Sequence, residues 1–76
     1  MNPEEFLTTF LGNIEVTEPT VNLDTQLSEI PQWDSLALLA TLAMADGAYG
    51  VQLNGVELQG CTSIGDIARL VASKLS

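Results

Sequence analysis

The chain has 76 residues, of which 46% are apolar; it contains no histidine and one cysteine, and its net charge is −8. This length predicts one domain over residues 1–76, and the apolar content suffices for a core and excludes disorder. The charge excludes nucleic acid as a partner, because that binding neutralises phosphates with Lys and Arg.

Acidic residues gather in the first half of the chain. Residues 1–38 hold seven acids and no Lys or Arg, whereas residues 39–76 hold three acids and two cations. Such a surface attracts basic protein partners, or it simply keeps a small domain soluble. On charge alone these two readings stay open.

The missing residue types exclude several kinds of site. Without histidine the commonest general base is absent, and neither zinc ligands nor a disulfide can be assembled around Cys61. We interpret Cys61 as a small buried hydrophobe and expect no metal and no catalysis from the chain itself. There is no membrane-spanning run and the acidic N-terminal stretch differs from a signal peptide, so we expect a cytoplasmic monomer.

A first helix is expected from Pro3 to about Asn13, with Asn2 as its cap. Its apolar residues recur at helical spacing and predict a buried stripe of Phe6, Leu7, Phe10, Leu11 and Ile14. Residues 15–34 then form a connection of a length that is usually functional or anchored by its own side chains. A short helical turn is expected at 24–28, and the expected anchors are Val21, Leu23, Leu27 and Ile30.

The second helix is expected to begin at Ser35 and to run to about Ala48, because Ala, Leu and Met favour helices. One of its faces is expected in the core, flanked by Leu39, and consists of Leu38, Leu42, Ala45 and Tyr49. A second face holds no charge, so it is either a partner surface or covered by another helix. That face comprises Leu36, Ala40, Ala43 and Gly47, with Met44 beside it.

The rest of the chain predicts two more helices. Asn54-Gly55 reads as a turn, followed by a short helical turn over residues 56–60. Ser63 and Asp66 form a capping box for a last helix, whose expected buried stripe is Ile64, Ile67, Ala68, Val71 and Leu75. No segment has a strand pattern. The predicted fold class is therefore all-α: a small antiparallel bundle of three main helices plus one short helix, with a long loop between the first two.

Trp33-Asp34-Ser35-Leu36 stands where the long loop gives way to the second helix. A serine there can cap the helix by accepting a bond from a backbone N–H. It can also be a point of covalent attachment, and a phosphodiester on it would lie where the helix dipole favours an anion. The tetrapeptide alone favours the cap, which is the commoner role.

The chain as a whole resembles the acyl carrier protein family, including the related peptidyl carriers. The resemblance runs from the first helix and the long loop through Asp34-Ser35-Leu36 to an aromatic residue, Tyr49, that closes the second helix. It continues through Val51-Gln52-Leu53 and a short third helix to residues 62–67, which open the last helix. Asp-Ser-Leu recurs by chance in many proteins, but at this position and in this helix order it is specific.

The resemblance implies that Ser35 receives 4′-phosphopantetheine from coenzyme A through a separate phosphopantetheinyl transferase, with Asp34 and Leu36 as its flanking motif. The thiol of the attached arm would hold acyl or aminoacyl groups as thioesters for loading and condensing enzymes. The chain would then be a carrier and not an enzyme. The open alternative is a helical module that binds its partners non-covalently, in which Ser35 is only a helix cap.

Departures from the resembled family indicate specialised biosynthesis. Gln32 stands where glycine is common, and Trp33 stands where a smaller residue is usual; Trp33 either packs under the loop, which we favour, or is exposed to partners. Only Asp46 is acidic in the second helix, whereas carriers of primary fatty acid synthesis resemble one another in an acid-rich helix there. We therefore expect polyketide, fatty-acid-like or peptide biosynthesis, with apolar docking through Trp33, Leu36, Ala40, Ala43 and Met44.

Overall fold

The computed structural model describes residues 2–16 and 20–75, and within them the chain forms four α-helices and no strand. In chain order these helices are α1 (Pro3–Asn13), α2 (Ser35–Tyr49), α3 (Gly55–Gln59) and α4 (Ile64–Leu75). A short 3₁₀ helix, η1 (Leu27–Glu29), lies in the long connection between α1 and α2. The predicted all-α fold class is confirmed, and none of these helices has the length and apolar character needed to cross a bilayer.

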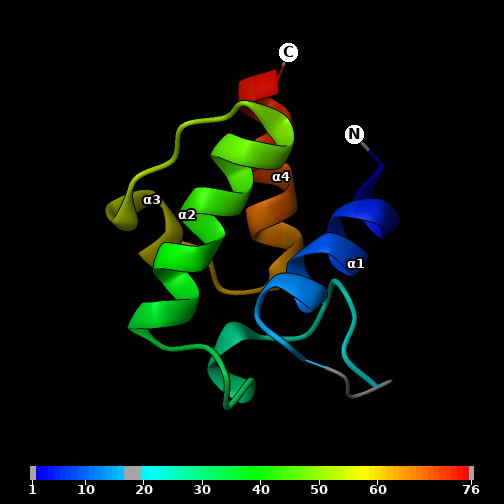
Figure 1. Ribbon diagram of the computed structural model, residues 1–76. Coiled ribbons are helices and arrows are strands. Elements are labelled where there is room, and N and C mark those ends of the chain that lie inside the picture. Colours follow the sequence, from blue (N-terminus) through cyan, green and yellow to red (C-terminus); the bar gives the residue numbers. More distant parts are fainter. Residues whose placement is uncertain (1, 17–19, 76) are drawn as a thin grey trace.

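The long helices lie side by side, with α1 running opposite to α2 and α4 (Figure 1). The helices α2 and α4 run in the same direction. The segment that connects them in sequence, which contains α3, returns the chain to the end of the bundle where α2 began. The long connection lies at one end of the bundle, where α1 ends and α2 begins. This end of the molecule therefore holds the Trp33-Asp34-Ser35-Leu36 tetrapeptide.

The predicted stripe of α1 forms much of the core. Phe6 and Phe10 are fully buried, and their rings stack with centroids 6.0 Å apart. Asn2 caps α1 by accepting a bond from the Glu4 N–H at 2.8 Å, as predicted. The buried residues of α4 follow the predicted stripe except at its end, where Leu75 is 44% exposed because α4 extends past the helices that cover it.

Backbone hydrogen bonds fasten the long connection to the start of α4. The N–H of Leu27 donates to the Thr62 carbonyl at 2.8 Å, and the N–H of Gly65 donates to the Leu23 carbonyl at 2.8 Å. A Cβ at residue 65 would lie 3.0 Å from that carbonyl oxygen, a tighter contact than most, so a larger residue there would have to push the two segments slightly apart. Two of the predicted anchors, Leu27 and Ile30, are each 4% exposed, whereas Val21 and Leu23 are half-buried. The connection is thus anchored, as its length predicted.

The predicted capping box of α4 is also present. The Asp66 N–H donates to Ser63 Oγ at 3.2 Å, and Asp66 Oδ2 accepts bonds from the N–H groups of Thr62 and Ser63 at 2.9 and 3.1 Å. These backbone bonds, followed by the bond to the Arg69 guanidinium, hold the pKa of Asp66 below its ordinary value of 3.8. The carboxylate of Asp66 therefore stabilises the fold only while it is ionised.

We expect Asp66→Asn to destabilise the protein at neutral pH and to do so less as the solution becomes acidic. A carboxyl whose pKa is lowered by folding contributes stability above its unfolded pKa, and this stability is lost as the pH falls through the folded pKa. Melting temperatures measured from about pH 7 to about pH 2.5 check this. Asp46→Asn is the control, because it removes the same charge from an exposed residue whose side chain makes no hydrogen bond among the described residues. Equal, pH-independent shifts for both variants would contradict the expectation.

Candidate functional site

The start of α2 is capped by Asp34, not by Ser35. Asp34 has an extended backbone, and its Oδ1 accepts a bond from the Ala37 N–H at 2.9 Å. The Asp34 carbonyl then accepts the first helical bond from the Leu38 N–H at 2.9 Å. The alternative role of Ser35 as the cap is therefore not observed, because the carboxylate one residue earlier already binds the free donor.

Ser35 is the first helical residue, and its side chain is exposed. Its hydroxyl makes no hydrogen bond to any residue that the structure describes. Ala37, by contrast, is buried two residues further on, so the helix is fixed in the core directly behind the serine. The result is a hydroxyl held out to solvent on a rigid support.

Trp33 connects this end of α2 to the core. Its ring packs against Phe10 with the centroids 5.8 Å apart, and its backbone N–H donates to the Ile30 carbonyl at 3.0 Å. The half-buried indole thus lies where we expected it, against the core beneath the loop. The position of Ser35 is consequently set by packing on both sides of Asp34.

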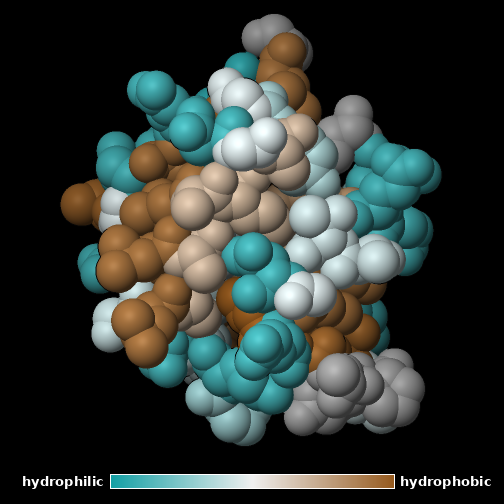
Figure 2. Space-filling view, in the orientation of Figure 1, coloured by the Kyte–Doolittle hydropathy of each residue, from teal (hydrophilic) through white to brown (hydrophobic). Residues whose placement is uncertain are grey.

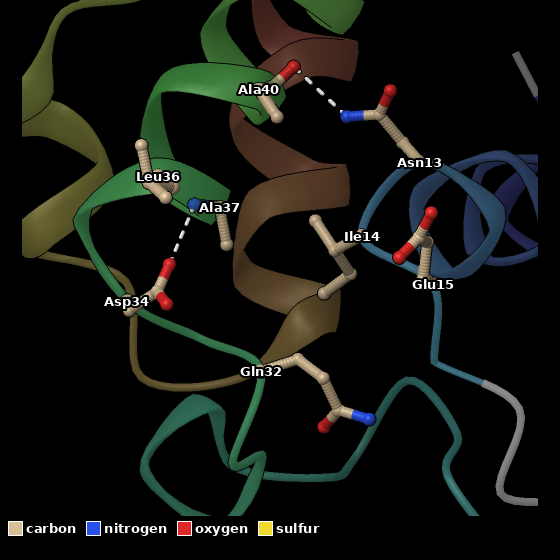
Figure 3. Close-up of a pocket in the computed structure, with 8 residues that line it drawn as sticks. All are labelled: Asn13, Ile14, Glu15, Gln32, Asp34, Leu36, Ala37 and Ala40. Atoms are coloured by element: carbon tan, nitrogen blue, oxygen red, sulfur yellow. Dashed lines mark hydrogen bonds between the residues drawn. The ribbon is translucent and has the colours of Figure 1, made fainter.

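A pocket of about 220 Å³ opens beside Ser35, between the end of α1 and the start of α2 (Figure 3). Asp34 and Leu36, the two neighbours of Ser35 in sequence, both line it. The side chain of Asn13 joins the two helices across it, since its Nδ2 donates to the Ala40 carbonyl at 2.9 Å. The remaining lining residues are Ile14, Glu15, Gln32, Ala37 and Ala40.

An apolar surface adjoins the serine on another side of α2. Leu36 is 75% exposed and Leu39 is 60% exposed, and Val56 of α3 is 80% exposed. Figure 2 shows apolar side chains gathered over α3 and the neighbouring part of α2. We call Leu36, Leu39 and Val56 the apolar patch.

The predicted partner face of α2 needs correction. Met44 is only 8% exposed and belongs to the core, and Ala40 is half-buried beside the pocket, so of that face Leu36, Ala43 and Gly47 are exposed. Leu39, expected beside the core, is exposed. Because α2 is apolar on every side, its neighbours decide which residues are buried. Its buried face is Ala37, Thr41, Met44 and Ala45, with Leu38, Leu42 and Tyr49 half-buried.

Sequence reasoning missed two groups of residues at this site. Leu39 follows Leu36 by three positions, and this helical spacing places both on one face, so the signal was present. Val56 joins them only through the packing of α3 on α2. Asn13, Glu15 and Gln32 likewise reach the pocket from different segments, and no local pattern connects them.

The thiol of Cys61 is not equipped to react. It is half-buried and donates to the Glu57 carbonyl at 3.6 Å, and burial raises its pKa, which keeps it protonated. The described parts of the chain also hold no group of three or more His, Cys, Asp or Glu residues placed to bind a metal ion.

Comparison with known proteins agrees with this geometry. A family model described as phosphopantetheine attachment site matches residues 4–71, which include most of α1 and α4 and all of α2 and α3. Neither the curated proteins nor the solved structures contain a significant match. Members of the matched family carry covalently attached 4′-phosphopantetheine and work with phosphopantetheinyl transferases and partner enzymes. The chain belongs to this phosphopantetheine attachment family and is a carrier protein.

Proposed function

We propose that Ser35 is the residue to which phosphopantetheine is attached. One observation carries this proposal: the Ser35 hydroxyl is exposed and unbonded among the described residues, while Asp34 caps the helix. A hydroxyl that makes no hydrogen bond within the fold can be esterified with little loss of stability. The alternative, in which Ser35 serves only as a cap, loses its basis for the same reason.

The surroundings of Ser35 fit a phosphodiester. The first N–H groups of a helix have no partner within it, and Asp34 binds only that of Ala37, which leaves the N–H groups of Ser35 and Leu36 facing the helix end. These donors and the helix dipole favour an anion there. Both cations of the chain are paired elsewhere, Arg69 with Asp66 and Lys74 with Glu57. The backbone, not a basic side chain, would stabilise the phosphate.

The function we propose is the carriage of acyl or aminoacyl intermediates between partner enzymes. When bound, the prosthetic group supplies the terminal thiol on which these intermediates are held as thioesters. The protein would tether the cargo and present it for recognition, and tethering raises the local concentration of cargo at each partner. Loading and condensing enzymes would supply the reactions.

We further propose that this carrier serves specialised biosynthesis of a polyketide, fatty-acid-like or peptide product. The support is the character of α2, which carries a single acid, Asp46, and presents the apolar patch beside Ser35. An exposed apolar surface of this kind is typical of a protein contact. Partners would therefore dock through apolar contact around Leu36, Leu39 and Val56, with Ala43 at the edge.

Attachment at Ser35 is tested by loading the protein with coenzyme A and a broad-specificity phosphopantetheinyl transferase. We expect a mass gain of one phosphopantetheinyl group on the intact chain. Cleavage after Glu29 and Glu57 then gives the fragment 30–57, in which Ser35 is the only serine. We expect the added mass on this fragment. An unchanged mass, or an adduct on another fragment, would refute the proposal.

We expect Val56→Glu and Leu39→Glu each to lower kcat/KM for loading by the transferase by tenfold or more. A charge in the centre of an apolar contact must be desolvated without a partner, which costs more than the roughly 1–3 kcal/mol of an unpaired neutral polar group. Leu75→Glu is the matched control, because Leu75 is also an exposed apolar residue but lies at the far end of α4 (Figure 1). Equal loading kinetics for the patch variants and the control would show that this patch is not the docking surface.

A further inference from the structure

The pair Asn54-Gly55, which the sequence marks as a turn, lies at the start of α3. Asn54 is the N-cap of this helix, its side chain is exposed, and Gly55 is the first helical residue. The chain has four asparagines, and only Asn54 is followed by glycine. A glycine has no Cβ to keep its backbone nitrogen away from a neighbouring side chain. Asn54 is therefore the asparagine of this chain whose side-chain amide is most open to attack by the next residue.

Two hydrogen-bonding features favour such an attack at Asn54. Its Oδ1 accepts a bond from the Glu57 N–H at 2.8 Å. A backbone N–H in this position stabilises the negative charge that a carbonyl oxygen gains when its carbon is attacked. The N–H of Gly55 belongs to the first turn of α3, where no helical acceptor exists, and it makes no hydrogen bond among the described residues. The attacking nitrogen is thus unengaged, and the carbonyl under attack is polarised.

The helix α3 restrains this pair, but only weakly. It has five residues, of which Leu58 is buried. Its start is held by the capping box, in which the Asn54 N–H donates to Glu57 Oε1 at 3.2 Å. Short segments with few buried contacts open locally at a small cost in free energy. Each opening frees the Cα–C bond of Asn54 to rotate and lets the nitrogen of Gly55 reach Cγ of Asn54.

We propose that Asn54 is a site of spontaneous deamidation, which converts it slowly into isoaspartate and aspartate. The nitrogen of Gly55 bonds to Cγ of Asn54 and loses its proton to solvent, while the side-chain amide leaves as ammonia. One water molecule then opens the resulting cyclic imide at either carbonyl. Opening at Cγ gives aspartate, and opening at the main-chain carbonyl gives isoaspartate. The reaction needs no enzyme, and asparagine is one of the thermolabile residue types.

The two products differ in what they do to α3. Aspartate caps a helix as well as asparagine does, so it leaves the capping box in place. Isoaspartate carries the main chain through Cβ, which lengthens the chain and moves the carbonyl oxygen that the Glu57 N–H binds. The start of α3 is then lost, and with it the position of Val56, the second residue of this helix. Because Val56 belongs to the apolar patch, isoaspartate formation would weaken docking, a consequence that rests on the proposed function of the patch.

Peptide mapping of aged protein tests the modification. The apo protein is kept folded in mildly alkaline buffer and then cleaved after its glutamates, so that the fragment 30–57 contains Asn54 as its only asparagine. We expect this fragment to gain the mass of an NH₂-to-OH exchange, with isoaspartate located at residue 54 by electron-transfer fragmentation. Asn13 and Asn22, which are also exposed, are internal controls in other fragments and should remain unmodified over the same time.

Gly55→Ala is the matched variant. A Cβ at residue 55 would lie 3.8 Å from Leu38 Cδ2, an ordinary contact, so the variant keeps α3 while its methyl group hinders the attacking nitrogen. We expect it to lose most of the mass gain. A gain on fragment 30–57 that is absent, or no faster than at Asn13 and Asn22, or equally fast in Gly55→Ala, would overturn the proposal.

The effect on docking is measured as kcat/KM for loading by the transferase. We expect aged protein to load more slowly than fresh protein, in proportion to its isoaspartate content, and Asn54→Asp to load like the original sequence. Treatment with isoaspartyl methyltransferase, which returns isoaspartate to aspartate, should restore the rate. Loading of aged protein at the full rate would overturn the link between Asn54 and docking. Failure of the proposed carrier function is distinguishable, because fresh protein would then not load at all.

Discussion

Ser35→Ala should abolish loading completely and leave the stability of the apo protein almost unchanged. The hydroxyl is the only group the substitution removes, and it is exposed and unbonded among the described residues. Surface substitutions of this kind usually change the free energy of unfolding by less than about 0.5 kcal/mol. Intact-mass measurement after incubation with the transferase checks the first expectation, and urea denaturation of the apo form checks the second.

The complementary variant is Asp34→Ala, which, unlike Ser35→Ala, should lower the stability of the apo protein. It removes the carboxylate that binds the Ala37 N–H, and the loss of such a cap costs about 0.5–2 kcal/mol. Asp34→Asn is its control, because an asparagine side chain also caps helices well. If Ser35→Ala proved the more destabilising of the two alanine variants, the assignment of the cap to Asp34 would be wrong.

Phe10→Ala is expected to have the largest effect on stability. Phe10 is fully buried, stacks on Phe6 and contacts Trp33. Its removal therefore leaves a cavity between the core and the end of the molecule that holds Ser35. Such truncations cost about 3–5 kcal/mol. A chain of 76 residues has a total stability of about 4–11 kcal/mol, so the variant retains little of it.

Thermal denaturation followed by circular dichroism measures this loss, since each kcal/mol shifts the melting temperature of a domain of this size by about 4–8 °C. The control is Val56→Ala, which truncates a side chain that is 80% exposed and should change stability by less than about 0.5 kcal/mol. Loading of Phe10→Ala should also weaken, because Trp33 loses the ring against which it packs. A melting temperature within a few degrees of the original would contradict the central place of Phe10 in the core.

The fold could be predicted where local chemistry decides it. Asn2 and the Ser63–Asp66 pair mark helix starts through bonds within a few residues, and both are present. Phe6 and Phe10 are buried as their spacing predicts. The start of α2 was located correctly at Ser35, but the capping residue was not, because Asp and Ser are both good caps and the backbone angles of Asp34 choose between them.

The site could be predicted only in part, because its surfaces depend on tertiary packing. In α2 no charge separates the faces until Asp46, so the sequence cannot show that Met44 lies inside and Leu39 outside. Val56 reaches the apolar patch through the placement of α3. The departure at Gln32 was visible in the sequence, but that its carbonyl oxygen is buried without a partner depends on the end of α1 and the loop around it.

The backbone bonds between the long connection and the start of α4 affect how the end of the molecule that holds Ser35 can move. Leu27 and Gly65 take part in a backbone junction that joins residues 23–27 to residues 62–65, so these two stretches must open together. In hydrogen exchange, we expect the amide hydrogens of Leu27, Ile64 and Gly65 to exchange as one cooperative unit. Part of the segment that leads to Ser35 is thus tied by its backbone to the start of α4. If Ser35 is the attachment point, as proposed, the reach that a carrier needs between enzymes comes from its prosthetic arm and not from this junction.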